Sequence, residues 1–416
     1  MKSLHKKTAI FFIASVITSA TSPSYAAPSY ERPVTLKASN ILSPDLVKGP
    51  HHQINEKVVN DAFLNIYTLH SDYGDVQVTS TAKLRKYIHE VNAVAKMKEI
   101  QGSDEFAKGM KNKAGAVVEG AGDLITDPIG TVGDTVSGVG KLFSRAGENM
   151  FGGARSDSEG SRMGSLLGYA KAKREIGYKL GVDVYSHNEI LQKELNELSS
   201  AGGTGTLVMS GLLMAVPGGA GAAVSVAGGT KLMTNLVYWD KSPADLRTMN
   251  RGRLASMGVS EDVADLFIAN GIYTPREQTL LVESLYNMSN TAGRDQYIKL
   301  ATVTEDIDMA FFRQRQAEMY AAYNTRIQPI TRFVAVGSTS AAMAKNGDII
   351  FNVPLDHLLW TKGIAAVVRI ATQNVALMKG VNERHLLLSG TASKMARESL
   401  EKMGWKVQEN SDANLF

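Results

Sequence analysis

Residues 198–230 form a stretch of 33 residues without a charged side chain, and this stretch limits the folds open to the chain. Its length would allow one membrane-spanning helix. However, Pro217-Gly218-Gly219 interrupts it near the middle, and it contains nine glycines. Each half has about 14–16 residues, or about 21–24 Å of helix, which is less than the hydrocarbon core of about 30 Å. We therefore predict a buried helical hairpin over 198–230; a hairpin dipping into a membrane and a single tilted span are the alternatives.

The first 26 residues have the three-part pattern of a secretory signal peptide. Three lysines begin it, residues 8–20 are uncharged and mostly apolar, and Ser24-Tyr25-Ala26 supplies the small residues of a cleavage site. The apolar part is too short for a membrane span. We predict cleavage after Ala26 and export to the periplasm, where the protein would be free or membrane-associated. An N-terminal anchor that stays attached is the alternative.

The composition narrows the classes of partner and chemistry. Cleavage removes three lysines and no acidic residue, so the formal net charge falls from +4 to +1. So small a charge gives no general attraction to nucleic acid, and we expect no nucleic-acid partner. The chain has no cysteine, which excludes disulfides, thiolate catalysis and thiolate zinc sites. With 44% hydrophobic and 21% charged residues the chain is globular, and residues 27–416 suffice for two or three domains.

Two predicted regions precede the helical part of the chain. Residues 27–55 contain four prolines and little periodicity, which predicts an extended tether. Residues 56–165 form the second region, with a short strand over 75–81 and an amphipathic helix over 84–98. Eight Lys or Arg against four acidic residues make the stretch 81–115 basic. An ordinary helix with a solvated basic side is expected there, and a helix lying on an anionic membrane is the alternative.

The second region also contains a glycine-rich segment, 102–164, with fourteen glycines among its 63 residues. Apolar residues nevertheless recur there at spacings of three and four, which is a helical pattern. Glycine costs about 1 kcal/mol relative to alanine at each helical position, so such helices need a surface to lie on. We predict two amphipathic helices divided at Asp127-Pro128 and packed on the protein. A membrane surface and a disordered segment are the alternatives.

Residues 166–328 are predicted to be a helical domain that contains the uncharged hairpin. Ser186 and Glu189 have the spacing of a capping box, which would begin a helix at this point. Proline or acidic residues in the first turn mark three further helix starts, which follow Ser242, Ser260 and Thr274. The pattern over 291–323 indicates one long helix or two helices in line.

Residues 329–416 are predicted to form a small α/β domain. Asn346-Gly347 lies between two β-like runs within 341–353, which is a strong signal for a β-hairpin. A strand, a helix and a final strand follow within 385–407, an order that favours parallel strands joined by a right-handed crossover. The whole chain is therefore predicted to be α+β and mainly α: a helical body with a C-terminal β-hairpin and βαβ unit.

The chain lacks the sequence motifs of familiar catalytic and cofactor sites, including H-E-x-x-H, Walker A, G-x-S-x-G and the dinucleotide-binding glycines. Glu305 and Asp308 would share a helical face, but a solvated helix side explains them better than a carboxylate pair. Asp356-His357 is better explained as a cap and a satisfied histidine than as a catalytic pair. We predict no catalytic residue, no metal ligand and no cofactor.

The best candidate for a binding site is the segment 389–393. An apolar strand runs there into a helix N-terminus through small hydroxyl residues and a glycine. Free N–H groups and the helix dipole favour an anion at such a position, and open α/β sheets bind ligands at this end of their strands. Ser389, Gly390, Thr391 and Ser393 are thus candidate ligand-binding residues. A simple helix cap is the competing interpretation.

The sequences GYAKAKRE at 168–175 and LGVDVYS at 180–186 resemble runs in exported proteins of Gram-negative bacteria. The segments 242–254 and 389–405 are similar to theirs as well. The resemblance spans most of the mature chain. It points to an uncharacterised family with no assigned activity, and it implies export but no catalytic residues.

The sequence favours a non-enzymatic periplasmic protein that contacts an envelope protein or a membrane surface. This hypothesis rests on two apolar, glycine-rich segments in a chain without a catalytic constellation. The first alternative is an enzyme or a binder of small anionic ligands that uses the C-terminal α/β domain. The second is a membrane-active effector whose hairpin, 198–230, inserts into a target membrane. No oligomeric state is predicted.

Overall fold

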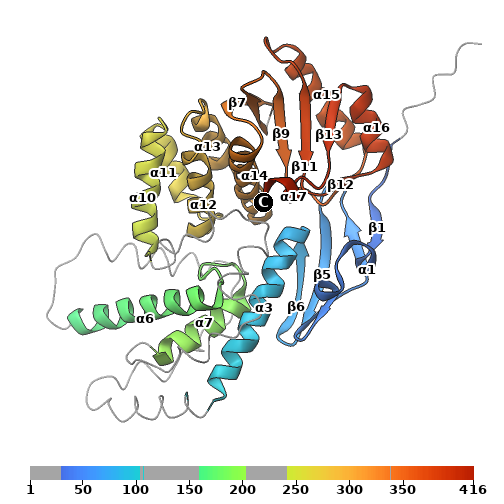
Figure 1. Ribbon diagram of the computed structural model, residues 1–416. Helices are drawn as coiled ribbons and strands as arrows, with labels where there is room; N and C mark the ends of the chain where they lie inside the picture. The colour runs from blue at the N-terminus through green and yellow to red at the C-terminus, as the bar shows by residue number, and fades with distance from the viewer. Residues whose placement is uncertain (1–29, 104–105, 107–158, 203–240, 338) are drawn as a thin grey trace, which may run out of the picture.

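The computed structural model describes residues 30–103, 106, 159–202, 241–337 and 339–416 (Figure 1). They form a mixed α+β fold with two main sheets, and more residues are helical than extended. The predicted signal peptide, most of the glycine-rich segment and most of the uncharged hairpin lie outside the described residues. Among the helices that are described, none is long and apolar enough to span a membrane.

The N-terminal sheet is antiparallel, and its strand β5 (Asn65–Ser71) pairs with three neighbours. The other strands are β1 (Val34–Lys37), β2 (Lys48–Gly49), β3 (His52–Ile54), β4 (Lys57–Asn60) and β6 (Gly74–Thr79), with short helices α1 (Ala38–Ile41) and α2 (Pro44–Val47) between them. The expected tether over 27–55 is therefore wrong from residue 34 onwards. Leu46 and Ile54 are buried in the core of this sheet, and Pro44 is the first residue of a helix rather than part of a loop.

Helix α3 (Thr81–Gln101) connects the two halves of the N-terminal region and confirms the helix predicted over 84–98. Leu84 and Ile88 pack on the sheet, whereas Val94 and Met97 belong to a second core formed with α6 (Glu159–Leu180) and α7 (Glu189–Gly202). The described part of α3 therefore has its apolar side chains packed into two cores of the protein, as expected for an ordinary structural helix.

The start of α7 differs from the prediction. Asn188, not Ser186, is the capping residue: its Oδ1 accepts hydrogen bonds from the N–H groups of Ile190 (3.1 Å) and Leu191 (3.3 Å). The Ser186 hydroxyl instead accepts from the Asn188 N–H at 3.2 Å. Asn188 is held in place because its amide also donates to the buried carboxylate of Glu90 at 3.0 Å.

The C-terminal sheet has the strand order β13-β11-β9-β8-β7. Its elements are β7 (Ile330–Val336), β8 (Thr339–Ala344), β9 (Ile349–Val353), β11 (Arg384–Leu388), β13 (Trp405–Gln408) and the helices α15 (Lys362–Ala376) and α16 (Lys394–Lys402). The hairpin turn falls at Asn346-Gly347, as predicted, and Gly347 takes the positive φ of +89° that such turns require. Strands β9, β11 and β13 are parallel, which confirms the predicted β–α–β ending.

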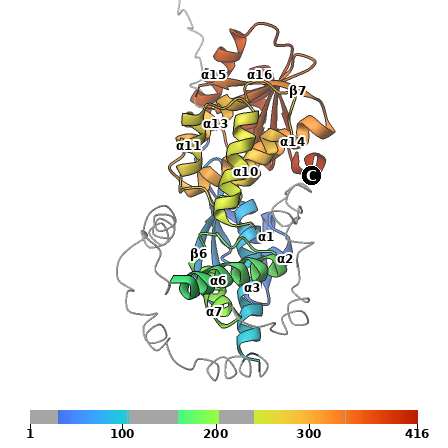
Figure 2. The same ribbon diagram turned by 90° about the vertical axis from the view of Figure 1, so that its left-hand side faces the viewer.

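Helices cover both faces of this sheet (Figures 1 and 2). Helices α13 (Arg294–Thr302) and α14 (Ile307–Arg326) lie against one face. Helices α10 (Pro243–Ser256), α11 (Glu261–Ala269) and α12 (Pro275–Tyr286) pack behind them. Tyr320 and Phe333 stack edge to face in this core, with ring centroids 5.2 Å apart. The opposite face packs on α15 and α16. In this core the rings of Phe351 and Trp405 pack edge to face, with centroids 5.1 Å apart.

The packing divides the predicted helical domain, 166–328, into two parts. Helices α6 and α7 share a core with α3, whereas α10 to α14 share one with the C-terminal sheet. The 291–323 pattern corresponds to two helices, α13 and α14, which are separated by residues 303–306. The short elements β10 (His357–Leu358), β12 (Thr391–Ala392) and α17 (Asp412–Leu415) complete the described fold.

Two predicted helix starts are complete capping boxes. Ser242 exchanges hydrogen bonds with Asp245, and Thr274 exchanges them with Glu277. The Thr274 hydroxyl also donates to Asp183 at 3.2 Å, so it links α12 to the loop before α7. Ser260 precedes α11 as predicted, but its side chain makes no cap hydrogen bond.

Replacement of Thr274 by alanine is expected to lower the free energy of unfolding by about 1–2 kcal/mol, because a cap bond and one hydrogen bond to buried Asp183 are both lost. Ser260→Ala is the matched control and should cost less than about 0.5 kcal/mol. Urea unfolding followed by circular dichroism measures both. Equal losses in the two variants would contradict the assigned role of Thr274.

Candidate functional site

The carboxyl ends of β9, β11 and β13 are the part of the C-terminal sheet where open α/β folds bind ligands. The candidate segment 389–393 leaves β11 at this edge. In this protein the N-terminal sheet and the first turn of α3 face the same edge (Figure 1). The candidate site is therefore built between two sheets that lie far apart in the sequence.

Asp356, which follows β9, makes the central contact of this site. Its carboxylate accepts hydrogen bonds from the backbone N–H of Asn65 at 2.8 Å and from that of Thr81 at 3.0 Å. Thr81 is the first residue of α3, so Asp356 caps a helix that lies 275 positions away along the chain. Burial raises the pKa of Asp356, and the hydrogen bonds from Asn65 and Thr81 act in the opposite direction.

Backbone hydrogen bonds extend the contact on either side of Asp356. The N–H of Leu359 donates to the carbonyl of Ala62 at 3.0 Å, and the N–H of Asp356 donates to that of Phe63 at 3.2 Å. The buried amide of Asn60 adds a bond to the carbonyl of His357 at 3.2 Å. The loop between β4 and β5 is thus fixed to the segment that follows β9, which supports the cap interpretation of Asp356-His357.

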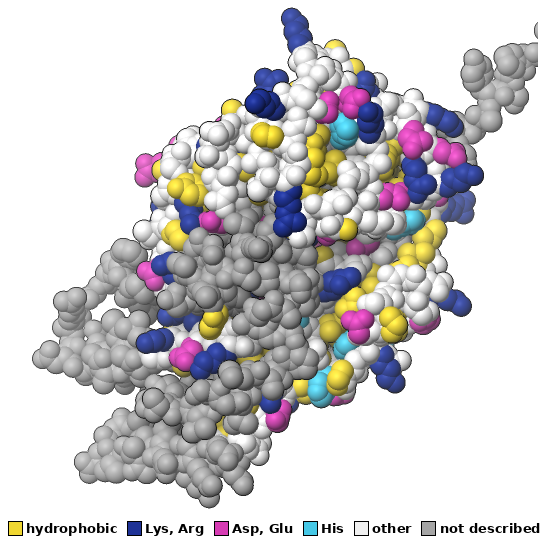
Figure 3. All heavy atoms as spheres, in the orientation of Figure 1, with side chains coloured by type: hydrophobic (Ala, Val, Ile, Leu, Met, Phe, Trp, Pro, Cys, Tyr) yellow, Lys and Arg dark blue, Asp and Glu magenta, His cyan; other side chains and the backbone are white. Residues whose placement is uncertain are grey.

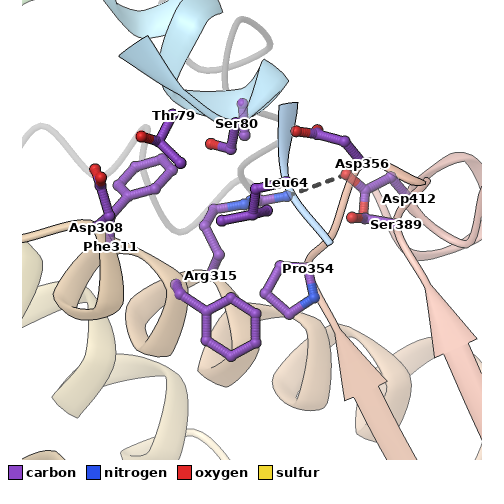
Figure 4. A pocket seen from close by; sticks show the side chains of 12 residues that line it. Leu64, Thr79, Ser80, Asp308, Phe311, Arg315, Pro354, Asp356, Ser389 and Asp412 are labelled. Atoms are coloured by element: carbon purple, nitrogen blue, oxygen red, sulfur yellow. Dashed lines mark hydrogen bonds and ion pairs between the residues drawn. The ribbon is translucent and has the colours of Figure 1, made fainter. Parts of the chain in front are cut away.

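A small cavity with several charged side chains in its lining remains at this junction (Figure 4). Arg315 reaches into it from α14, and Asp356 and Asp412 lie at its far side. The other lining residues are Leu64, Thr79, Ser80, Ala82, Asp308, Phe311, Phe312, Pro354 and Ser389. The cavity measures about 30 Å³, which is room for about two water molecules and far less than a metabolite needs.

The charged side chains of the cavity are compensated by neighbouring groups. Buried Arg315 donates to Glu318 at 2.7 Å and to Asp412 at 3.2 Å, and its guanidinium lies over the ring of Phe416. Burial raises the pKa values of Glu318 and Asp412, while Arg315 lowers them. Asp308 forms an ion pair with Lys83 from α3. The pair of Lys83 with Asp308 therefore joins the two halves of the protein, whereas the pair of Arg315 with Asp412 joins α14 to α17 within the C-terminal part.

The predicted ligand-binding residues also make contacts within the protein. Ser389 lines the cavity, but its hydroxyl donates to the carbonyl of Leu355 at 2.7 Å. Gly390 is required by close packing, because an added Cβ would lie 2.0 Å from the carbonyl oxygen of Asp356. The hydroxyl of Thr391 lies 2.7 Å from Nδ1 of His357, whose pKa is lowered by burial.

Ser393 caps α16, accepting a hydrogen bond from the N–H of Ala396 at 3.0 Å. The same hydroxyl donates to the carboxylate of Glu31 at 2.6 Å. Close by, the N–H of Ala392 donates to the carboxylate of Glu409 at 3.0 Å. The chain's own carboxylates thus occupy the helix N-terminus, where the sequence suggested an external anion. Ser389 and Ser393 consequently do not converge on one ligand position.

The expected face of acidic residues on α14 is not formed. Helix α14 begins at Ile307 with Asp306 as its cap, so exposed Glu305 precedes the helix. Asp308 points instead towards Lys83. Two residues of the site were missed by the sequence analysis. Arg315 falls within the buried stripe of α14, which is an unusual place for a charge, and Asp412 follows β13 at the same edge as Ser389.

Comparisons of the chain with protein-family models, with curated proteins and with solved structures give no match. The function is therefore inferred from the site and the surface of this protein.

Asp356→Ala should lower the free energy of unfolding by about 2–4 kcal/mol, because two buried N–H groups lose a charged acceptor. Hydrogen exchange at the Asn65 and Thr81 amides should accelerate. The control is Asp306→Ala, which removes a local cap of α14 and should leave those two amides protected. Unchanged exchange at both amides in the Asp356 variant would contradict the capping role.

Proposed function

We propose that this is an exported, non-enzymatic protein that associates with the membrane surface in the periplasm. The observation that carries the proposal is the outer side of α15. Val367 is 63% exposed, Ile370 55% and Leu377 83%. Their spacing of three and seven residues places them on one side of the helix. Three large apolar side chains are thus presented together to solvent.

The charged residues within the segment that carries this apolar stripe, which we define as Val367, Ile370 and Leu377, are all positive. Lys362 and Arg369 are exposed on the same helix, and Lys379 follows its end. No Asp or Glu occurs between residues 357 and 382. An apolar stripe beside basic side chains is the surface that binds at the interface of a membrane with anionic lipids.

The position of α15 gives access to such a surface. The helix lies on the outer face of the C-terminal sheet, opposite α10 to α14 (Figure 2). Figure 3 shows basic and apolar side chains at the top of the molecule, the part formed by this sheet and its helices, with acidic and histidine side chains among them. The signal peptide predicted from the sequence and the resemblance to exported proteins support the compartment.

The non-enzymatic part of the proposal is supported by the candidate site. Asp356, Ser389, Thr391 and Ser393 all make hydrogen bonds within the protein. These bonds hold the N-terminal sheet and residue 31 against the carboxyl edge of the C-terminal sheet. The same side chains are the ones that a ligand would need there.

Flotation with lipid vesicles tests the membrane association. The protein without its signal peptide should float with vesicles that contain anionic lipid, and less with zwitterionic vesicles or at high salt. The double variant Ile370→Asn/Leu377→Asn should bind about tenfold more weakly, because apolar area at the interface is lost. Leu266→Asn is the control, since Leu266 is 64% exposed on α11 beside the acidic Asp265. If the unmodified protein stays wholly in solution, the proposal fails.

A thermal-shift measurement tests the competing function, a binder of small anions. Inorganic phosphate and phosphorylated metabolites should leave the melting temperature unchanged, because Glu31 and Glu409 occupy the start of α16. A saturable rise in melting temperature that disappears in Ser393→Ala would favour the anion binder instead.

A further inference from the structure

Three side chains of metal-binding type lie together at the amino edge of the C-terminal sheet, away from the candidate site. They are Asp348, Glu383 and His385, and one ligand atom of each lies within 4.8 Å of the others. Asp348 directly precedes β9 and Glu383 directly precedes β11. The parallel register pairs the next residues of the two strands, so Asp348 and Glu383 are neighbours. Alternation along β11 then places His385 on the same face as Glu383.

The distances between these ligand atoms agree with the distances between neighbouring ligand atoms around a bound metal ion. Nε2 of His385 lies 3.3 Å from Oδ2 of Asp348 and 3.2 Å from Oε2 of Glu383. Ligands bound at about 2.0–2.2 Å in a tetrahedral zinc site lie about 3.3 Å or slightly more from one another. An ion could therefore be bound by all three groups with small movements of their side chains.

Neighbouring groups orient the two carboxylates. Oδ1 of Asp348 accepts a hydrogen bond from the Glu383 N–H at 3.2 Å, and Oδ2 accepts one from the Asn346 amide at 2.6 Å. Lys406 on β13 contacts Oε1 of Glu383, which leaves Oε2 facing His385. Metal-binding carboxylates are commonly held by such surrounding hydrogen bonds.

We propose that Asp348, Glu383 and His385 bind a divalent transition metal ion of the zinc type. One imidazole with two carboxylates suits such an ion, and three protein ligands leave a position open for solvent. Asp348 is only 8% exposed, so its carboxylate is held in place at the buried side of the site. The Glu383 side chain is 44% exposed, so an ion can enter from solvent on that side. This proposal does not depend on the membrane association proposed above.

Calorimetric titration of the tag-free mature chain with Zn²⁺ at neutral pH tests the proposal. The unmodified protein should bind one ion at this site, and His385→Ala and Glu383→Gln should each bind it at least about tenfold more weakly. His70→Ala is the matched control: His70 pairs with Asp75 at 2.8 Å in the N-terminal sheet but belongs to no such three-ligand group within the described chain. It should bind zinc like the unmodified protein.

Circular dichroism of every variant shows whether the fold is kept, and Glu383→Gln serves as the test if His385→Ala does not fold. Substitution of Co²⁺ provides a second readout, because a four-coordinate cobalt site absorbs visible light strongly. No saturable zinc binding by the unmodified chain would overturn the proposal. Unchanged binding in both site variants, or an equal loss in His70→Ala, would overturn it as well.

Discussion

The carboxylate of Asp356 belongs to the C-terminal sheet, but the backbone groups that it binds belong to the N-terminal sheet and to α3. Because α3 is also the helix that connects the N-terminal sheet to α6 and α7, this contact helps to position both groups of elements against the C-terminal sheet. The ion pair of Lys83 with Asp308 joins α3 to α14 at the same junction, and Arg315 with Asp412 joins α14 to α17 beside it.

This use of the carboxyl edge explains how an α/β ending can be present without an open ligand site. The polar groups that open α/β folds direct at a substrate are here directed at another part of the same chain. Within the described part of the chain, our proposals therefore concern two other surfaces, the outer side of α15 and the amino edge of the sheet. The first is apolar and basic, and the second gathers a histidine and two carboxylates.

Features that depend on neighbouring residues could be predicted from the sequence, and features that depend on distant ones could not. The cap at Thr274, the hairpin turn and the β–α–β ending each follow from a few consecutive residues. The pairing of Asp356 with Thr81 and that of Ser393 with Glu31 join positions with no local signal. The sequence predicted the cap at Ser393 but not its contact with the carboxylate of Glu31. The predicted tether was wrong for the same reason, because its strands form only by pairing with strands further along the chain.

The contacts of Glu31 bear on the order in which the parts of the chain can fold. Glu31 binds the backbone of Trp360 and the hydroxyl of Ser393, which lie 329 and 362 positions further along the chain. Contacts of such long range form late, because the whole intervening chain must first be ordered. Glu31 therefore cannot complete its contacts until the chain has been synthesised as far as Ser393. Assembly of the first described residues onto the C-terminal sheet is thus one of the last steps of folding, even though these residues are synthesised long before their partners.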